Sequence, residues 1–275
     1  MDTFSRNGLT FDVRDAGPAD AEPVVLLHGF PQDSTAWDHV APALHRHGLR
    51  TLAPDQRGYS PMARPRGRAQ YRLRETTADV LSLLDAAGLG SAHVVGHDWG
   101  AAVAWALAAW HPERVRTMTA LSVPHPAAMA RAMVTSDQAL RSYYMGLFQL
   151  PAVPEALILA RGAAPLRRLL TRGGLPDDAV ARYVERMREP GALTGALGWY
   201  RALPWNGRDP VGRVRVPTLH VWSTGDAFLG RAATEATARF VEAPYRLEVL
   251  EGVNHWIPEL APDVVADLVA AHVRS

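Results

Sequence analysis

Residues 92–105 read AHVVGHDWGAAVAW and combine the end of a strand, a sharp turn and the start of a helix. The apolar run AHVV suits a buried parallel strand because it is short and contains two valines. Gly96 and Gly100 stand two residues on either side of Asp98, where a sharply turning chain needs residues without a Cβ. The alanine-rich segment 101–110 then predicts a helix whose first N–H groups point at whatever binds beside Asp98.

This stretch resembles the nucleophile elbow of the α/β hydrolases, G-x-nucleophile-x-G, with Asp98 where esterases carry serine. A serine that attacked a saturated carbon would form an ether that water could not cleave. A carboxylate that attacks such a carbon forms an ester, and water can then attack the ester carbonyl. We therefore expect a substrate with an electrophilic sp³ carbon, either an epoxide or an alkyl halide.

Strands and helices alternate in the first half of the chain. The expected strands are 9–14, 23–27, 49–54, 92–95 and 115–123, and the expected helices are 37–46, 73–87 and 101–110. Alternation of this kind predicts the α/β class with a mostly parallel, doubly wound sheet.

The alternation stops between residues 125 and 210, where the composition is helical and no convincing strand occurs. The expected helices of this segment are 129–133, 137–150, 155–159, 177–188 and 193–202. A helical insertion after a core strand would cover the carboxyl ends of the strands, where α/β folds bind ligands. We therefore expect an α/β-hydrolase core of residues 1–124 and 211–275 and a helical cap of residues 125–210.

The remaining catalytic groups are expected on late loops of the core. Strands are predicted at 216–223 and 246–250, and Asp226 and His255 follow them. In α/β hydrolases the nucleophile, acid and histidine occur in this order along the chain. Some relatives carry the acid after the strand 115–123, but the residues there are Pro124, His125 and Pro126. Asp226 is therefore the expected acid and His255 the expected base.

The loop His28-Gly29-Phe30-Pro31 follows the strand 23–27 and should face the elbow. In this fold such a loop gives one backbone N–H to the oxyanion hole, and the residue after the nucleophile gives the other. We expect these donors to be Phe30 and Trp99. A tight turn is needed at this loop, so we also expect a cis peptide bond before Pro31.

Composition excludes several other classes of protein. The chain has 275 residues, a formal net charge of +1 and no cysteine. These features give no reason to expect a nucleic-acid partner, and they exclude disulfides and thiol catalysis. The histidines lack metal-ligand spacing such as HExxH, so we expect neither a metal nor a cofactor.

No apolar run is long enough to cross a membrane, and the N-terminus lacks the profile of a signal peptide. We therefore expect a cytoplasmic location and no membrane partner. The expected assembly is a monomer or a homodimer. The arginine-rich stretch 64–74 contains Pro65 and Gly67 and leads into an amphipathic helix, so a solvated loop is expected there rather than a nucleic-acid patch.

Over nearly its whole length the chain resembles an epoxide hydrolase of the α/β-hydrolase superfamily. The motifs that carry the resemblance are HGFP at 28–31, GHDWG at 96–100, YYMGLFQLP at 143–151, GWYR at 198–201 and the Asp226 and His255 loops. In that family one tyrosine from each of the two cap motifs donates a hydrogen bond to the epoxide oxygen. The motif positions place these tyrosines at Tyr144, rather than its neighbour Tyr143, and at Tyr200.

The resemblance implies hydrolysis of an apolar epoxide to a vicinal diol through an ester on Asp98. Neutral phenols with a pKa near 10 suit this reaction, because they can donate to the oxygen as it becomes negative. The expected substrate-binding residues are Phe30, Trp99, Met145, Phe148, Trp199 and Trp256.

Two alternatives remain at this stage. A haloalkane dehalogenase shares the aspartate elbow and often the following tryptophan, and it holds the halide between two N–H donors. Phe30 stands where its asparagine donor would be, although Trp199 or Trp205 could supply an N–H. A fluoroacetate dehalogenase would carry arginines where Trp99 and Val103 stand, and we set it aside. The other alternative is a ligand-binding protein without activity, since fold does not fix function.

Overall fold

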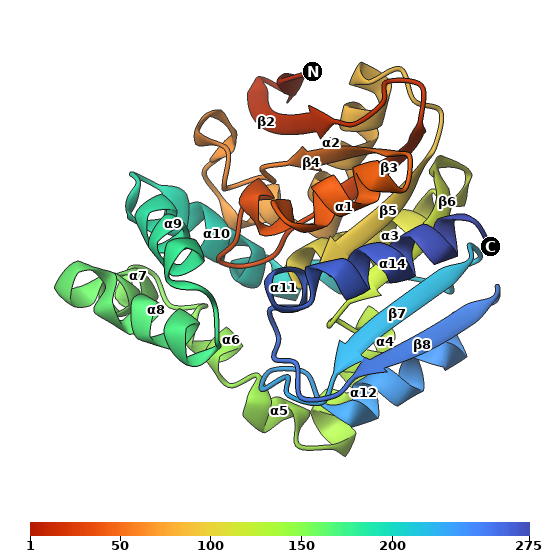
Figure 1. Cartoon of the computed structure of the whole chain (residues 1–275). Coiled ribbons are helices and arrows are strands. Elements are labelled where there is room, and N and C mark those ends of the chain that lie inside the picture. The colour runs from red at the N-terminus through yellow and green to blue at the C-terminus, as the bar shows by residue number, and fades with distance from the viewer.

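The computed structural model describes residues 1–275 and contains one eight-stranded sheet (Figure 1). Its strands are β1 (Thr3–Arg6), β2 (Leu9–Ala16), β3 (Glu22–Leu27), β4 (Leu49–Pro54), β5 (Ala92–His97), β6 (Val115–Leu121), β7 (Thr218–Ser223) and β8 (Tyr245–Leu250). Their order in the sheet is β1-β2-β4-β3-β5-β6-β7-β8. The strands from β3 to β8 pair in parallel, whereas β1 and β2 pair antiparallel at one edge. The expected α/β class with a mostly parallel sheet is confirmed.

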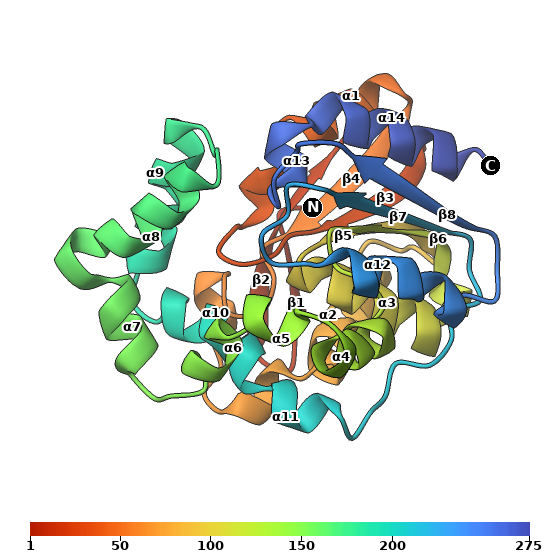
Figure 2. The same cartoon turned by 90° about the horizontal axis from the view of Figure 1, so that it is seen from below.

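Helices cover both faces of the sheet (Figures 1 and 2). One face carries α1 (Val40–Arg46) and α14 (Pro262–Val273), and the other carries α2 (Leu73–Ala86), α3 (Trp99–Trp110) and α12 (Arg231–Ala236). Every residue of β5, in the middle of the sheet, is buried. Burial on both faces explains why the parallel strands read as continuous apolar runs.

Eight helices connect β6 to β7 and form a helical insertion without strands. They are α4 (Pro126–Thr135), α5 (Gln138–Arg141), α6 (Tyr144–Leu147), α7 (Val153–Ile158), α8 (Ala160–Arg172), α9 (Asp177–Arg188), α10 (Ala192–Arg201) and α11 (Leu203–Asn206). A further helix, α13 (Ile257–Leu260), precedes α14. No helix of the chain is both long and apolar enough to cross a membrane.

Short 3-10 helices occupy several connections. They are η1 (Ser34–Trp37), η2 (Pro61–Ala63), η3 (Arg68–Tyr71), η4 (Pro112–Arg114) and η5 (Thr237–Phe240).

The structure differs from the sequence expectations at β1 and α8. Strand β1 was not expected, although Asn7 and Gly8 carry the positive φ angles of a tight hairpin turn between β1 and β2. Helix α8 was not expected because Gly162 and Pro165 are typical of a break. The break exists, since residues 161–163 have left-handed φ angles, but regular helix follows it. The expected helix 137–150 is divided into α5 and α6.

Candidate active site

The backbone of Asp98 has φ 51° and ψ −119°, a conformation that residues with a side chain rarely adopt. It lies between β5 and α3, as the elbow argument requires. A Cβ on Gly100 would lie 2.0 Å from the carbonyl oxygen of Leu27, and one on Gly96 would lie 2.2 Å from the carbonyl oxygen of Gly100. Glycine is therefore necessary at both positions, because Gly100 passes close to the end of β3 and Gly96 passes close to the start of α3.

The loop after β3 holds one oxygen of the Asp98 carboxylate. The backbone N–H of Phe30 donates to Asp98 Oδ1 at 2.8 Å, and the peptide bond between Phe30 and Pro31 is cis, as expected. Gly29 lets the loop approach this closely, since a Cβ there would lie 2.3 Å from the Asp98 Cβ. Trp99 is the first residue of α3, where N–H groups have no partner within the helix. The arrangement is suited to stabilising negative charge on an oxygen bound to the Asp98 carbonyl carbon.

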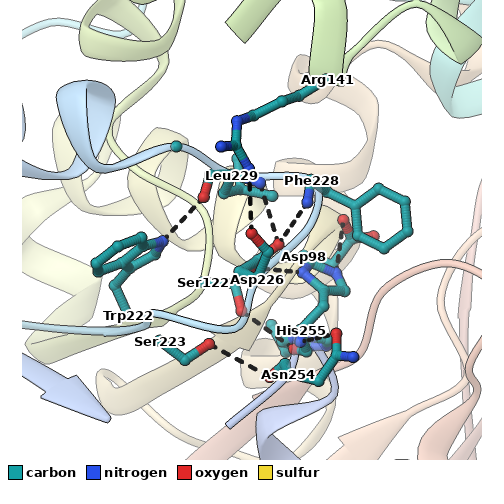
Figure 3. Close-up of polar contacts among 12 residues, drawn as sticks. Asp98, Ser122, Arg141, Trp222, Ser223, Asp226, Phe228, Leu229, Asn254 and His255 are labelled. Atoms are coloured by element: carbon teal, nitrogen blue, oxygen red, sulfur yellow. Dashed lines mark hydrogen bonds and ion pairs between the residues drawn. The ribbon is translucent and has the colours of Figure 1, made fainter. Parts of the chain in front are cut away.

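His255 lies between the two aspartates named from the sequence (Figure 3). Its Nδ1 lies 2.8 Å from Asp226 Oδ2, and its Nε2 lies 3.7 Å from Asp98 Oδ2. The other oxygen of Asp226 accepts the backbone N–H groups of Phe228 at 2.8 Å and Leu229 at 3.0 Å. Asp226 is thus fixed by its own loop, and it orients the imidazole so that Nε2 faces the nucleophile.

The two carboxylates determine the charge of the imidazole. Burial alone would lower the pKa of His255, but the charge and hydrogen bond of Asp226, together with Asp98, raise it to about 10. Burial likewise works against ionisation of Asp98, yet its interactions with His255 leave the pKa of Asp98 below its ordinary value. At neutral pH the free site therefore holds an ionised nucleophile beside a protonated histidine.

A buried chain of hydrogen-bonded polar groups lies behind His255. His97 has Nε2 2.9 Å from the backbone carbonyl oxygen of His255 and Nδ1 2.8 Å from Gln32 Oε1. The amide of Gln32 donates to Glu259 Oε1 at 2.7 Å, and Tyr183 of α9 donates to the same oxygen at 2.8 Å. Gln32 directly follows HGFP, but nothing in the sequence places Glu259 beside it.

Two cavities meet at the nucleophile, and both are lined by Asp98, Tyr144, Tyr200 and Phe228. One has a volume of about 360 Å³ and the other about 310 Å³. The rings of Tyr144 and Tyr200 have centroids 6.0 Å apart. Burial, and then the charge of Asp98, raises the pKa of both phenols, so both are neutral proton donors beside the nucleophile.

Most of the apolar residues named from the sequence line these cavities. Phe30, Phe148 and Trp256 line the larger cavity, and Trp99 and Met145 line the smaller. Lining residues that the sequence reasoning missed include Ala102, Met129, Met133, Leu169, Leu203 and Phe228. Only Met129 and Met133, spaced i and i+4 on one predicted helix, carried a signal of a shared face.

Trp199 was expected to be a substrate-binding residue, but it lines neither cavity. Its indole N–H donates to the backbone carbonyl oxygen of Arg57 at 2.7 Å, and its buried ring packs against Trp99. Helical periodicity explains the difference, since neighbouring residues on α10 point in different directions and Tyr200 faces the cavities instead. Trp205 also lines neither cavity. Neither tryptophan is therefore placed to hold a halide beside Asp98.

No group of three or more His, Cys, Asp or Glu side chains is arranged to hold a metal ion.

A strand-to-helix elbow with an aspartate, a histidine–acid pair on late loops and a parallel sheet define the α/β-hydrolase class. The family model for the alpha/beta hydrolase fold matches residues 22–262, and the chain belongs to this family.

The relatives and solved structures that the chain resembles include several epoxide hydrolases. It is 35% identical to Epoxide hydrolase A of Mycobacterium tuberculosis, over 94% of this chain and 92% of that protein. It is also 35% identical to the AB hydrolase superfamily protein YfhM of Bacillus subtilis, over 98% and 96% of the two chains. The crystal structure of Epoxide hydrolase A from Mycobacterium thermoresistibile superimposes with a TM-score of 0.87 at 28% identity, over 99% of this chain and 97% of that one.

Proposed function

We propose that the protein hydrolyses an apolar epoxide to a vicinal diol through a covalent ester on Asp98. The observation that carries the proposal is the position of Asp98, which lines one cavity together with Tyr144 and Tyr200 and has its Oδ2 3.7 Å from His255 Nε2. The epoxide hydrolases among its relatives support the same reaction.

In the first step, Asp98 Oδ2 attacks one epoxide carbon and the bond from that carbon to the epoxide oxygen breaks. The oxygen takes up the electron pair, and a proton from Tyr144 or Tyr200 neutralises it. An alkoxide is a poor leaving group in water, so each phenol donor should lower the barrier by about 3 kcal/mol, as one oxyanion-hole donor does. The product of this step is a hydroxyalkyl ester of Asp98.

In the second step, the ester no longer carries the negative charge of Asp98. The pKa of His255 should fall because one of its two neighbouring carboxylates is neutral, so the imidazolium releases its proton to solvent. The neutral imidazole can then accept a proton from water. The resulting hydroxide attacks the ester carbonyl, and the N–H groups of Phe30 and Trp99 receive the oxyanion. Collapse of this intermediate breaks the bond between the carbonyl carbon and the ester oxygen, and that oxygen takes the proton of the new Asp98 carboxyl group and leaves as part of the diol. The tyrosine regains from solvent the proton that His255 released earlier, and His255 keeps the proton taken from water.

Part of the helical insertion acts as a cap in this proposal. Residues 125–210 supply both tyrosines and the apolar residues Met145 and Phe148, whereas residues 1–124 and 211–275 supply the nucleophile, the oxyanion donors and the histidine–acid pair. A small-molecule epoxide is the proposed substrate, and no cofactor takes part.

We further propose a cytoplasmic location and a role in detoxification or secondary metabolism. Cell fractionation would test the location, and a gene deletion would test the role.

Two measurements test the reaction. Styrene oxide should yield its diol, whereas a haloalkane dehalogenase would release bromide from 1,2-dibromoethane. Tight binding without turnover of either compound would instead support a ligand-binding protein.

In a single turnover in heavy-oxygen water, the first diol should receive its oxygen from Asp98, and the label should enter the Asp98 carboxylate. Label that appeared wholly in the first diol would rule out the ester.

A further inference from the structure

Exposed large apolar side chains are concentrated in one part of the chain. Ten such side chains are exposed in the whole molecule, and eight lie in the helical insertion between residues 134 and 169. They are Val134, Leu140, Tyr143, Leu147, Leu150, Val153, Leu157 and Leu169. Single exposed apolar residues are ordinary, but a concentration of this kind marks an interaction surface.

Several of these residues surround the opening of the substrate cavity. Leu140 and Tyr143 line the larger cavity and are 78% and 76% exposed, so this cavity reaches the solvent between them. Leu169 of α8 lines the same cavity and is 46% exposed. Helices α7 and α8 continue the surface and project from one end of the molecule, away from the sheet (Figures 1 and 2).

Helix α8 adds positive charge to this apolar surface. Its residues Arg161, Arg167, Arg168 and Arg172 are exposed, and their side chains form no ion pair with a carboxylate of the chain. The helix contains no acidic residue. The one carboxylate of α7, Glu155, is engaged by Arg201 at 2.7 Å and does not neutralise these arginines.

We propose that this surface of α5 to α8 docks on an anionic lipid bilayer, with the cavity opening turned towards the lipid. Basic residues beside exposed leucines on a helix are the pattern of a peripheral membrane contact. A second copy of the chain fits less well, because a symmetric contact through this surface would bring two patches of the same positive charge together. The inference rests on the proposed function, since an apolar epoxide partitions into the bilayer and could enter the cavity from there.

This inference revises the expectation of no membrane partner. That expectation followed from the absence of an apolar run long enough to span a bilayer. A peripheral contact needs no span, because it uses a face assembled from short helices that each contribute one or two apolar side chains.

Sedimentation with vesicles tests the inference. The protein should bind vesicles that contain phosphatidylglycerol and should bind those of phosphatidylcholine alone much more weakly. The triple variant R167Q/R168Q/R172Q should lose roughly a hundredfold in partition, about fivefold for each arginine. The matched control is R208Q/R239Q/R274Q, which removes the same charge from exposed arginines without carboxylate partners elsewhere, and it should bind as the wild type does.

A second variant, V153S/L157S, tests the apolar part and should weaken binding to the anionic vesicles without changing the net charge. Equal losses in the two arginine variants would mean that net charge alone drives binding, and the inference would fail. It would also fail if no vesicle bound, or if V153S/L157S abolished a dimer detected by light scattering. Diol formation from a water-soluble epoxide without vesicles is measured separately, so a failure of the proposed reaction would be distinguishable from a failure to dock.

Discussion

The Nε2 atom of His255 lies 3.7 Å from the Oδ2 atom of Asp98, beyond the length of a direct hydrogen bond but close enough for a strong electrostatic interaction. The spacing leaves Oδ2 free to attack a substrate carbon, because only Oδ1 accepts the Phe30 N–H. It also leaves His255 facing the carbonyl that the resulting ester would contain. One histidine can therefore stabilise the charged nucleophile first and activate water afterwards.

Removal of the histidine should separate the two steps. His255→Ala should still form the ester but should not hydrolyse it, because no base remains beside the Asp98 carbonyl. Mass spectrometry after addition of an epoxide should find the full mass of the substrate added to the peptide that carries Asp98. A halide substrate would add only its alkyl group, so the experiment also distinguishes the two chemistries. Direct attack of water on the epoxide predicts no adduct.

The pKa of His255 should depend on the charge of Asp98. Against the effect of burial, Asp226 and Asp98 raise the pKa of His255 to about 10, so the ring is protonated at neutral pH. Asp98→Asn keeps the shape of the nucleophile but, like the ester, carries no negative charge. The pKa of His255 should therefore fall in this variant. Titration of the imidazole resonances by NMR would measure the change. An unaltered pKa would contradict the proposed switch of His255 from cation to base.

The two cavity tyrosines should act together on ring opening. Replacing Tyr144 or Tyr200 by Phe removes one donor and should lower kcat roughly a hundredfold, and the double variant should be nearly inactive. Thermal unfolding should change little, because each variant loses only a hydroxyl group. Tyr143→Phe is the control, since that residue is exposed at the cavity opening and should be dispensable. Comparable activity losses at Tyr143 and Tyr144 would mean that the tyrosine roles are wrongly assigned.

Glu259 should make the stability of the protein depend on pH. Burial raises the pKa of Glu259 from 4.5 to about 7, although Gln32 and Tyr183 donate to it. Because the folded pKa lies above the unfolded one, the free energy of unfolding should fall as the pH rises from about 4.5 to 7. The shift in pKa corresponds to a loss of about 3 kcal/mol in the free energy of unfolding across this range.

Glu259→Gln should remove this dependence. Tm is compared at about pH 5, close to the unfolded pKa, and at about pH 8, above the folded pKa. The difference between the two Tm values should be smaller in the variant than in the wild type. The exposed Glu251→Gln should leave the difference unchanged. If Glu259→Gln kept the full pH dependence, the buried carboxyl would not be its source.

The sequence by itself determined the fold class, the elbow and the order of the catalytic groups. These features are local or follow chain order: Gly96 and Gly100 permit the turn, the apolar runs predict buried strands, and Asp226 and His255 come after late strands. Helix α8 was missed because its local composition, with Gly162 and Pro165, is typical of a break even though packing against α9 maintains a helix.

Only the tertiary structure decided which side chains reach the nucleophile and which face the solvent. Trp199 and Tyr200 are adjacent in sequence, yet one binds the backbone of Arg57 and the other lines the cavities. Gln32 and Glu259 lie 227 residues apart and meet only because the β3 loop and α13 converge behind His255. Such contacts depend on how distant elements pack, and neither residue spacing nor composition carries that information.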